Sequence, residues 1–347
     1  MREIKYTQAI NEAISQMMEF DGSIFVFGEG VDYNDGIFGS TDGLQQKFGK
    51  ERVFDTPLAE DALTGICVGA SIAGMRPVLV HARVDFLMLT MNQLVNHAAK
   101  WPYMCGGNIP ILIRAIVGRG WGQGAQHSQS LQALFAHIPG LQVVMPVSPF
   151  DAKGLTISAL KGTKPVISIE HRWLYDKIGE VPEEIYGVPI GKGKVIRSGQ
   201  DVTIIAVSHM VIEAMEVANY LQDKEISVEV IDLRTVRPID AEIICDSVRK
   251  TGRLLVVDNG WKACGISAEV AAIAAENVAE CLKANIVRIT LPDTPTPSSY
   301  VLENEYYPNS KKIVEAVFKI LDINKSSRGS ESCITKDPDE KHFKGPF

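Results

Sequence analysis

The sequence predicts an α/β protein built from two doubly wound domains. Short runs of β-branched and aromatic residues, each of strand length, alternate with segments whose apolar residues recur at helical spacing. Polar loops follow several of these runs, which is typical of folds with a parallel sheet. Residues 175–199 contain prolines and glycines without periodicity, and they separate two such series. We therefore expect a first domain at 1–190, a second at 200–323 and a flexible tail at 324–347.

The first series alternates strands with helices. Runs rich in valine, isoleucine and phenylalanine predict strands at 23–27, 76–81, 109–116, 142–145 and 165–170. Apolar residues three and four positions apart predict helices at 7–20, 62–74, 86–100, 131–137 and 149–160.

The second series is smaller and follows the same alternation. Its strands are predicted at 202–207, 227–233, 253–257 and 285–289. Its helices are predicted at 211–221, 241–248, 267–279 and 311–321. The proline-rich segment PDTPTP at 292–297 predicts a stiff connector between the last strand and the last helix.

The composition is that of a soluble globular protein, and it excludes several classes of function. The 347 residues carry a net charge of −7, which gives no reason to expect nucleic acid or an anionic membrane as a partner. No apolar run reaches the ~18 residues of a membrane span, and the N-terminus lacks the apolar core of a signal peptide. The six cysteines lack CxxC spacing, so we expect reduced cysteines in the cytoplasm or an organelle matrix.

Glu60 lies between two different segments of the first domain. It links a polar, turn-rich loop at 28–49 to the uncharged, glycine-containing run 62–74, which predicts a buried helix packed closely on a neighbour. A carboxylate at the mouth of such a helix is poorly solvated and can hold or pass a proton near neutral pH. The alternative is a solvated helix N-terminus, with Glu60 and Asp61 placed favourably at the positive end of the helix dipole.

Several further polar loops follow predicted strands. They carry Glu29, the segment 81–86, Arg114 and His127. Because ligands in doubly wound folds bind at the carboxyl ends of strands, these loops are candidates to meet at one edge. The glycine-rich loops match neither a phosphate-binding Walker motif nor a dinucleotide fingerprint, since GRGWGQG does not join a strand to a helix.

Several sequence words, in this order, are similar to those of one family. They are FGEGV (27–31), GLQQKFG (43–49), RVFDTPLAE (52–60), NQLVNHAAKWPYMCGG (92–107), GAQHSQS (124–130), AHIPGLQVVMP (136–146), PFDAKGL (149–155), DVTIIAVS (201–208), DLRTVRPID (232–240) and PDTPTP (292–297). Over about residues 3–322 the chain resembles the beta subunit of thiamine-diphosphate-dependent 2-oxo acid dehydrogenases, within the transketolase-like superfamily.

This resemblance implies a fold and an activity. The fold is a transketolase-like pyrimidine-binding domain followed by a transketolase C-terminal domain. The activity is oxidative decarboxylation of a 2-oxo acid, with transfer of the acyl group to a lipoyl group. One alternative is half of a split transketolase-like enzyme that transfers an acyl or two-carbon unit to a non-lipoyl acceptor. Another is an interaction subunit that kept the fold and lost the chemistry.

The resemblance also implies roles for individual residues. Glu60 matches the family glutamate that hydrogen-bonds N1′ of the cofactor aminopyrimidine and favours the imino tautomer that takes the proton from thiazolium C2. Phe86 matches the aromatic residue that stacks on the pyrimidine, with a core aromatic as the alternative. Leu58 and Glu29 are expected to join them in binding the cofactor.

Two further residues are expected near the substrate. His127 matches a family histidine that shifts protons during acyl transfer or orients the substrate carboxylate; a surface loop histidine is the alternative. Arg114 follows a strand and is a candidate to meet a carboxylate of the substrate, with a structural salt bridge as an equal alternative.

Half of the cofactor site is missing from the sequence. The family binds magnesium and the cofactor diphosphate through a GDG…N motif, and this chain contains no GDG. The resemblance therefore implies an alpha subunit that carries Mg²⁺ and the diphosphate, in a two-plus-two heterotetramer, with a lipoyl acyltransferase core as a further partner. It also implies a potassium site, to which no ligands are assigned.

Several positions depart from the family pattern. Asn92 stands where the family usually has Asp, and Cys105 where it usually has Ser. His81 and Arg83 replace residues that are usually acidic or apolar, and His209 replaces a small residue. These departures lie in loops expected near the substrate, so the sequence leaves open which 2-oxo acid is used and whether the acceptor is lipoyl.

Overall fold

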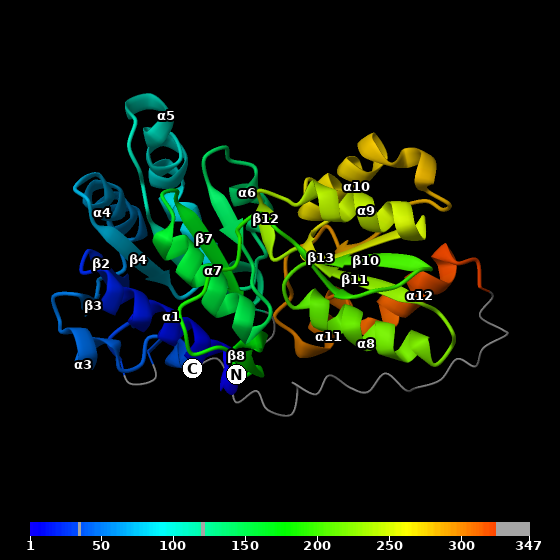
Figure 1. Cartoon of the computed structure of the whole chain (residues 1–347), viewed down its shortest axis with the longest axis horizontal. Helices are drawn as coiled ribbons and strands as arrows, with labels where there is room; N and C mark the ends of the chain where they lie inside the picture. Colours follow the sequence, from blue (N-terminus) through cyan, green and yellow to red (C-terminus); the bar gives the residue numbers. More distant parts are fainter. Residues whose placement is uncertain (34–35, 119–121, 324–347) are drawn as a thin grey trace. The chain divides into compact units, whose positions relative to one another are not determined.

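The computed structural model describes residues 1–33, 36–118 and 122–323 (Figure 1). The chain forms two compact units. The first unit contains Met1–Gly118, Leu134–Gly191 and Thr235–Pro238, and the second contains 122–133, Lys192–Arg234 and 239–323. Two short stretches, 122–133 and Thr235–Pro238, belong to a different unit from the residues on either side of them in the sequence. The predicted domain bounds of 1–190 and 200–323 stay predictions. The predicted tail at 324–347 lies outside the described residues.

A seven-stranded sheet is the centre of the first unit. In sheet order its strands are β12 (Thr235–Arg237), β6 (Gln142–Val144), β7 (Val166–His171), β5 (Leu112–Val117), β4 (Arg76–His81), β2 (Ile24–Gly28) and β3 (Val53–Asp55). Every pair is parallel except β12 with β6. A separate antiparallel pair joins β1 (Arg2–Lys5) to β8 (Ile178–Val181). All residues of the central strands β5 and β7 are buried, as expected for a sheet covered on both faces.

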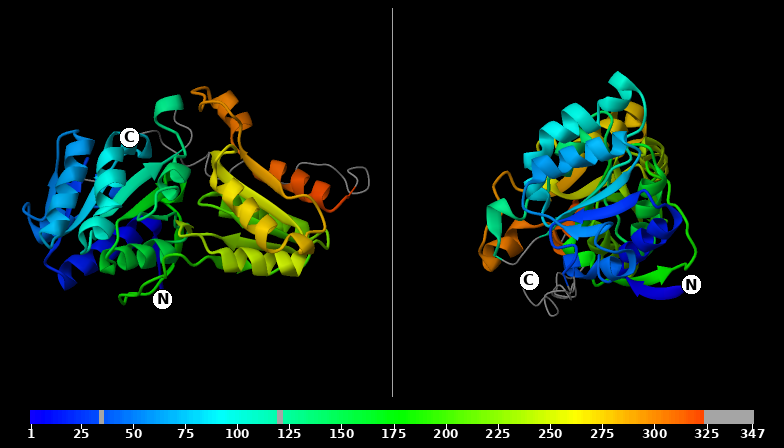
Figure 2. Two further views of the ribbon diagram at one scale, coloured as in Figure 1. Left: turned by 90° about the horizontal axis from the view of Figure 1, so that it is seen from above. Right: turned by 90° about the vertical axis from the view of Figure 1, so that its left-hand side faces the viewer.

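Helices cover both faces of this sheet (Figure 2). The helices of this part of the chain are α1 (Tyr6–Phe20), α2 (Gly36–Gly39), α3 (Leu44–Phe48), α4 (Glu60–Ile72), α5 (Trp101–Cys105), α6 (Gln132–Ala136) and α7 (Pro149–Lys161), and not all of them lie on the sheet. The helix α1 packs on α7, whereas α4 packs on β4 and on two irregular helices, η1 (Val84–Thr90) and η2 (Asn92–Ala98).

The predicted helix at 86–100 is wrong in its form. The structure has a 3₁₀-helix, η1, followed by a π-helix, η2. The hydroxyl of Thr90 donates a hydrogen bond to the carbonyl of Leu87 at 2.8 Å, which tightens the end of η1. Leu87 and Leu94 are both buried. The spacing of apolar residues thus predicted which residues face the core, but it did not predict the type of helix.

Gly28 allows β2 and β4 to approach closely at their carboxyl ends. Its φ is +138°, and a Cβ atom there would lie 2.2 Å from the carbonyl oxygen of Val80. The next residue, Glu29, donates its backbone N–H to that same oxygen at 3.1 Å. Pairing therefore continues beyond β2 and holds Glu29 against the end of β4.

The second unit contains a five-stranded sheet. In sheet order its strands are β14 (Val287–Leu291), β13 (Leu254–Trp261), β10 (Val202–Ala206), β11 (Val228–Asp232) and β9 (Lys194–Arg197), of which only β9 is antiparallel to its neighbour. Its helices are α8 (Met210–Gln222), α9 (Ala241–Thr251), α10 (Ile266–Asn277), α11 (Tyr300–Tyr306) and α12 (Ser310–Ile320). Figure 1 shows α9 and α10 over one face and α8 and α12 over the other.

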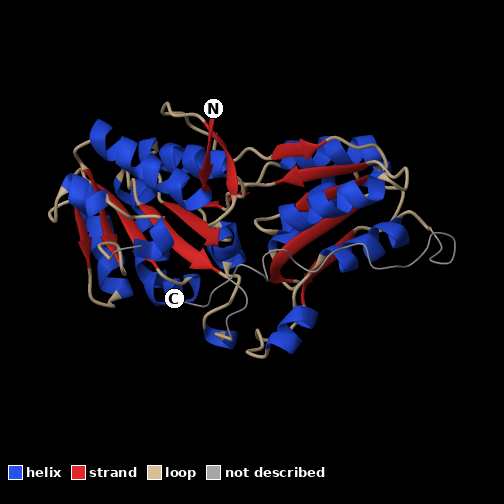
Figure 3. Ribbon diagram, turned by 90° about the horizontal axis from the view of Figure 1, so that it is seen from below, coloured by secondary structure: helices blue, strands red, loops and turns tan. Residues whose placement is uncertain are grey.

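The predicted α/β class is confirmed in both units. Figure 3 shows helices on both sides of the strands in each of them. The predicted second-series helix at 211–221 is α8, Met210–Gln222. The short antiparallel edge pairings of β1, β8, β9 and β12 were not predicted, because each has only three or four residues. Within the described ranges, every helix is too short or too polar to cross a membrane.

The second unit buries one acid beside an amide. Asp258 in β13 is 1% exposed, and its Oδ1 accepts a hydrogen bond from Nε2 of Gln132 at 2.8 Å. No described residue donates to its Oδ2. Burial raises the pKa of Asp258 to about 6, although the Gly260 N–H and the Gln132 amide oppose the shift. The folded state therefore favours the protonated form of Asp258 over the ionised form.

We expect Asp258→Asn to stabilise the second unit at pH 8 but not at acid pH. The folded pKa of about 6 lies above the ordinary value of 3.8, so the folding free energy of the natural chain becomes less favourable as pH rises between them. The full penalty, present above about pH 6, is at most about 3 kcal/mol. Urea unfolding of the natural protein and of the Asp258→Asn variant at pH 4 and pH 8 measures this difference in stability.

A matched control for that substitution is Asp246→Asn, which removes an exposed acid paired with Arg249 in the same unit. Its effect on stability should stay within ~1 kcal/mol at both pH values. An equal gain from Asp258→Asn at pH 4 and pH 8 would contradict the raised pKa.

Candidate active site

Residues from three neighbouring strands gather at one edge of the seven-stranded sheet. The order β4-β2-β3 is parallel, so the carboxyl ends of these strands share an edge. Glu29 follows β2 directly, Leu58 and Glu60 follow β3, and Phe86 lies in η1 after β4. The fold therefore brings together four of the predicted site residues.

Glu60 is the first residue of α4 and is half-buried. Its carbonyl oxygen accepts a hydrogen bond from the Thr64 hydroxyl at 2.8 Å, within the first turn of the helix. The helix places Glu60 and Asp61 at its positive end, as the alternative interpretation of this segment expected. Because α4 packs on η1, the segment that carries Phe86 lies against the same helix.

The helix α4 is buried on one side only. Leu63, Cys67 and Val68 face the core, whereas Ile66 is 53% exposed and Ile72 is 47% exposed. The prediction of a fully buried helix is therefore wrong for the single chain. The uncharged pattern of 62–74 indicated an apolar surrounding, but the chain itself covers only half of the helix.

Other exposed apolar side chains lie just before α4 and on η1, which packs against it. We call these side chains, together with those of α4, the α4 face and define it by Leu58, Ile66, Ile72, Met88 and Leu89, which are all exposed. Leu58, two residues before Glu60, is 78% exposed. Several exposed apolar side chains on elements that pack together are typical of interaction surfaces in soluble proteins. The candidate site thus borders a surface suited to a partner.

Glu29 has the most constrained carboxylate at this edge. Its Oε2 accepts a hydrogen bond from the Ala82 N–H at 3.0 Å. Its Oε1 lies 3.4 Å from Nδ1 of His81, the last residue of β4. Burial alone would raise the pKa of Glu29, but His81 and the Ala82 N–H outweigh it and lower that pKa. Glu29 therefore has an environment that favours its ionised form.

Phe86 is half-buried in η1, with Asp85 buried directly before it. Its ring is therefore neither part of the closed core nor fully solvated. A partly exposed aromatic side chain is compatible with the stacking role that the resemblance implies. Whether it stacks on a ligand stays a prediction.

Arg114 lies inside the protein, where a carboxylate of the chain itself already engages it, and its expected contact with a substrate stays a prediction. It is 1% exposed in β5, and its Nε and Nη2 each donate to the carboxylate of Glu170 in β7 at 2.8 Å. Its Nη2 also donates to Ser40 Oγ at 2.8 Å, and the Tyr175 hydroxyl donates to Glu170 at 2.7 Å. Arg114 forms the structural salt bridge that the sequence analysis left open.

His127 belongs to the second unit, so the edge described above does not include it. It ends the turn after η3 (Gly124–Gln126), where its backbone N–H donates to the Gly124 carbonyl at 3.4 Å. The side chain is half-buried. Its predicted role near the substrate stays a prediction.

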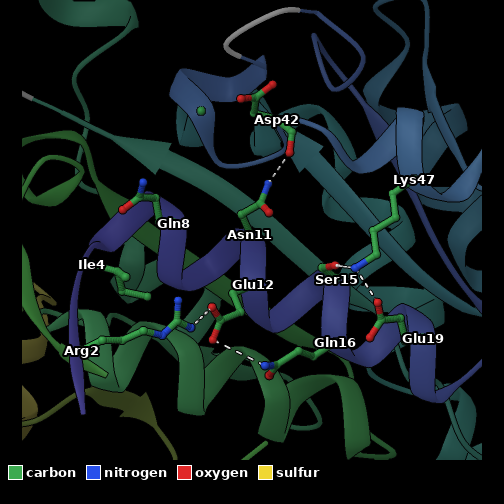
Figure 4. Close-up of a pocket in the computed structure, with 11 residues that line it drawn as sticks. Arg2, Ile4, Gln8, Asn11, Glu12, Ser15, Gln16, Glu19, Asp42 and Lys47 are labelled. Atoms are coloured by element: carbon green, nitrogen blue, oxygen red, sulfur yellow. Dashed lines mark hydrogen bonds and ion pairs between the residues drawn. The ribbon is translucent and has the colours of Figure 1, made fainter. Parts of the chain in front are cut away.

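A separate pocket of about 560 Å³ runs along α1 and contains none of the predicted site residues (Figure 4). Two ion pairs, Arg2 with Glu12 and Lys47 with Glu19 at 2.5 Å, engage four of its five charged side chains. Most of the charge along the pocket is thus neutralised within the chain. The pocket therefore gives no reason to move the site away from the edge at Glu60.

No metal centre is formed by the part of the chain that the structure describes, since no three His, Cys, Asp or Glu side chains cluster there with the arrangement a metal ion needs. The sequence analysis also missed one close pair, His81 with Glu29. The two residues are far apart in sequence, and only the adjacency of β2 and β4 brings them together.

Comparisons with known proteins agree with this geometry. Residues 2–177 match the model of the transketolase pyrimidine binding domain, and residues 191–313 match that of the transketolase C-terminal domain. A solved structure described as an inactive beta4 tetramer of a split gene transketolase superposes with a TM-score of 0.75 at 24% identity, covering 92% of this chain and 99% of that chain. At this identity the likeness shows the fold alone.

Curated proteins are more similar in sequence. The beta subunit of acetoin:2,6-dichlorophenolindophenol oxidoreductase from Cupriavidus necator is 42% identical over 332 residues, which cover 92% of this chain and 98% of that protein. The beta subunit of 2-oxoisovalerate dehydrogenase from Bacillus subtilis is 41% identical over 327 residues, which cover 93% and 100%. The similarity therefore extends over nearly the whole length of each relative.

Proposed function

The chain belongs to the transketolase-like family of 2-oxo acid dehydrogenase beta subunits, and from that premise we propose that it decarboxylates a 2-oxo acid as one subunit of a heteromer and passes the acyl group to a lipoyl group. One observation carries the proposal. Glu60, the first residue of α4, lies at the same edge of the sheet as Glu29 and Phe86. Exposed apolar side chains of the α4 face lie nearby.

The residues of this edge fit the aminopyrimidine half of thiamine diphosphate. A half-buried carboxylate, a half-buried aromatic ring and the exposed side chain of Leu58 are groups that suit an aminopyrimidine for hydrogen bonding, stacking and apolar contact. When bound, this cofactor supplies the electron sink that decarboxylation requires.

The chain's own residues then have distinct tasks. Glu60 accepts or gives the proton at N1′ of the aminopyrimidine, and Phe86 orients the ring by stacking. Glu29 adds a second, ionised carboxylate at the same edge. His127, from the second unit, orients the substrate carboxylate or moves a proton during acyl transfer.

The other half of the cofactor site is assigned to an alpha subunit. This chain contains no GDG motif, and its described residues hold no cluster suited to a metal ion. We assign Mg²⁺ and the diphosphate to that partner, in a two-plus-two heterotetramer, with a lipoyl acyltransferase core as acceptor. The α4 face supports the assignment, because it is apolar and borders Glu60. The five described cysteines are all free, which fits the cytoplasm or an organelle matrix.

A second candidate function is transfer of the acyl or two-carbon unit to an acceptor other than lipoyl. Two residues at the edge favour it. His81 and Arg83 are buried at 0% and 6% exposure beside Glu29 and Phe86, where the family usually has acidic or apolar residues. Relatives of this chain also differ in what they are named for, acetoin in one case and 2-oxoisovalerate in another.

An acceptor screen on the assembled heteromer tests the proposal. The chain is purified from its native source with its stoichiometric partner, loaded with thiamine diphosphate and Mg²⁺, and given a panel of 2-oxo acids. We expect carbon dioxide release and acylation of an added lipoyl domain, both detected by mass spectrometry. The same assay with the chain alone is the control, and it should show neither product.

The other outcomes of the screen are distinct. A new carbon–carbon bond to an aldehyde acceptor, without lipoyl acylation, would replace the proposal by the second candidate. An assembled heteromer that binds no thiamine diphosphate would indicate an interaction subunit without catalysis. Recovery of this chain without any partner would contradict the two-subunit site.

A further inference from the structure

A buried histidine and a carboxylate meet where β4 and β2 end. His81 is 0% exposed, and its Nδ1 lies 3.4 Å from Oε1 of Glu29, whose side chain is 11% exposed. Beyond this contact with Glu29, no described residue is within hydrogen-bond geometry of either ring nitrogen of His81. Glu29 is thus the acidic group that the imidazole faces at ion-pair distance.

Backbone contacts hold Glu29 next to His81. Gly28 lets β2 approach Val80 so closely that the Glu29 N–H donates to the Val80 carbonyl at 3.1 Å. The N–H of Ala82, on the other side of His81, donates to Glu29 Oε2 at 3.0 Å. Glu29 is therefore held by main-chain groups on both sides of His81, so its second oxygen is presented to the imidazole.

We propose that His81 is a positioning residue, which donates from Nδ1 to Glu29 and holds that carboxylate in place at the cofactor edge. The inference rests on the proposed function. It follows that the two carboxyl groups at this edge have different roles. Glu29 stays charged, and Glu60 is left as the carboxyl group that exchanges a proton with the bound aminopyrimidine.

The electrostatic surroundings of the pair are set by several elements. The charged groups on the neighbouring elements include Asp55 of β3, Glu60 and Asp61 of α4, Arg83 and Asp85 after β4, and Arg114 of β5. Asp55 accepts a hydrogen bond from the Gly30 N–H, and Arg114 is enclosed with Glu170. Arg83 is influenced by Asp85, whose charge opposes the lowering of the Arg83 pKa by burial. His81 is the neighbour that acts directly on the carboxylate of Glu29.

The first test is a double-mutant cycle in the full chain without cofactor. His81→Leu, Glu29→Gln and the double variant are compared with the natural chain by urea unfolding at pH 7. We expect the effects to be non-additive, with a coupling factor of about tenfold in the unfolding equilibrium constant. Additive effects would overturn the inference, and this result does not depend on the activity of the protein.

The second test measures thiamine diphosphate binding to the assembled heteromer by calorimetry between pH 6 and pH 8. Without His81, burial is expected to raise the pKa of Glu29, so the carboxylate is protonated as pH falls. His81→Leu should therefore weaken binding about tenfold or more at pH 6 and less at pH 8. His81→Asn, whose amide retains a donor near the Nδ1 position, should restore most of the affinity at pH 6.

A matched control is His97→Leu, which removes an exposed histidine of η2. It should leave the pH dependence of binding unchanged. Equal loss of affinity in His81→Leu and His81→Asn at all pH values would reduce His81 to a packing residue and overturn the inference. If the natural heteromer binds no thiamine diphosphate, the proposed function fails instead, and the double-mutant cycle still decides whether the pair is coupled.

Discussion

Glu60→Gln is expected to remove turnover from the assembled heteromer while leaving the fold intact. Glutamine has the same size and can still accept a hydrogen bond, but it cannot take or give the proton that the proposed role at N1′ requires. Loss of a positioned acid–base group lowers rates by about 100-fold to 10,000-fold. Because Glu60 is half-buried at the first position of α4, the substitution removes no core contact.

The measurement is kcat/KM for 2-oxo acid decarboxylation, with thermal unfolding and circular dichroism as checks on the fold. Asp61→Asn is the matched control, because Asp61 occupies the next position of the same helical turn and is exposed. It should change kcat/KM by less than about fivefold, since a charge at a helix N-terminus contributes at most about 1 kcal/mol. Turnover by Glu60→Gln within tenfold of the natural protein would rule out the proposed role of Glu60.

The second large effect is expected in stability. Arg114→Met leaves Glu170 buried at the centre of the first unit without its bidentate partner. Burial would lower the pKa of Arg114, but Glu170 outweighs it and raises that pKa, so the guanidinium remains charged in the core. Removing one member of a buried ion pair destabilises a protein by about 3–5 kcal/mol. We expect a loss of that size, measured by urea unfolding.

The double variant Arg114→Met with Glu170→Gln should recover part of this loss. It removes the unpaired charge, yet the glutamine can still accept a hydrogen bond from the Tyr175 hydroxyl. The control is Arg249→Met, which breaks an exposed pair with Asp246 and should cost at most ~1 kcal/mol. A loss below ~1 kcal/mol in Arg114→Met, or no recovery in the double variant, would show that the pair is not the stabilising element described above.

Several features of this protein were evident in local sequence. The alternation of strand-like runs and helical periodicity predicts the α/β class, and the described sheets and helices confirm it. The segment RVFDTPLAE places Glu60 at a helix start, and α4 begins at that residue. The missing GDG motif is also a property of the sequence itself. Such features depend on residues within one or two turns of each other, so local pattern is sufficient to reveal them.

Other features needed the order of strands in the sheet. Arg114 follows the pattern of a strand end, but only the pairing of β5 with β7 shows that Glu170 encloses it. The pair of His81 with Glu29 depends in the same way on β4 lying beside β2.

Sequence by itself thus determined the class of fold, the start of α4 and the lack of a GDG motif. The tertiary structure alone decided which charges meet and which apolar side of α4 stays open. The physical reason is that periodicity reports how strongly a side chain avoids water. It does not report which distant strand, helix or partner subunit will cover that side chain.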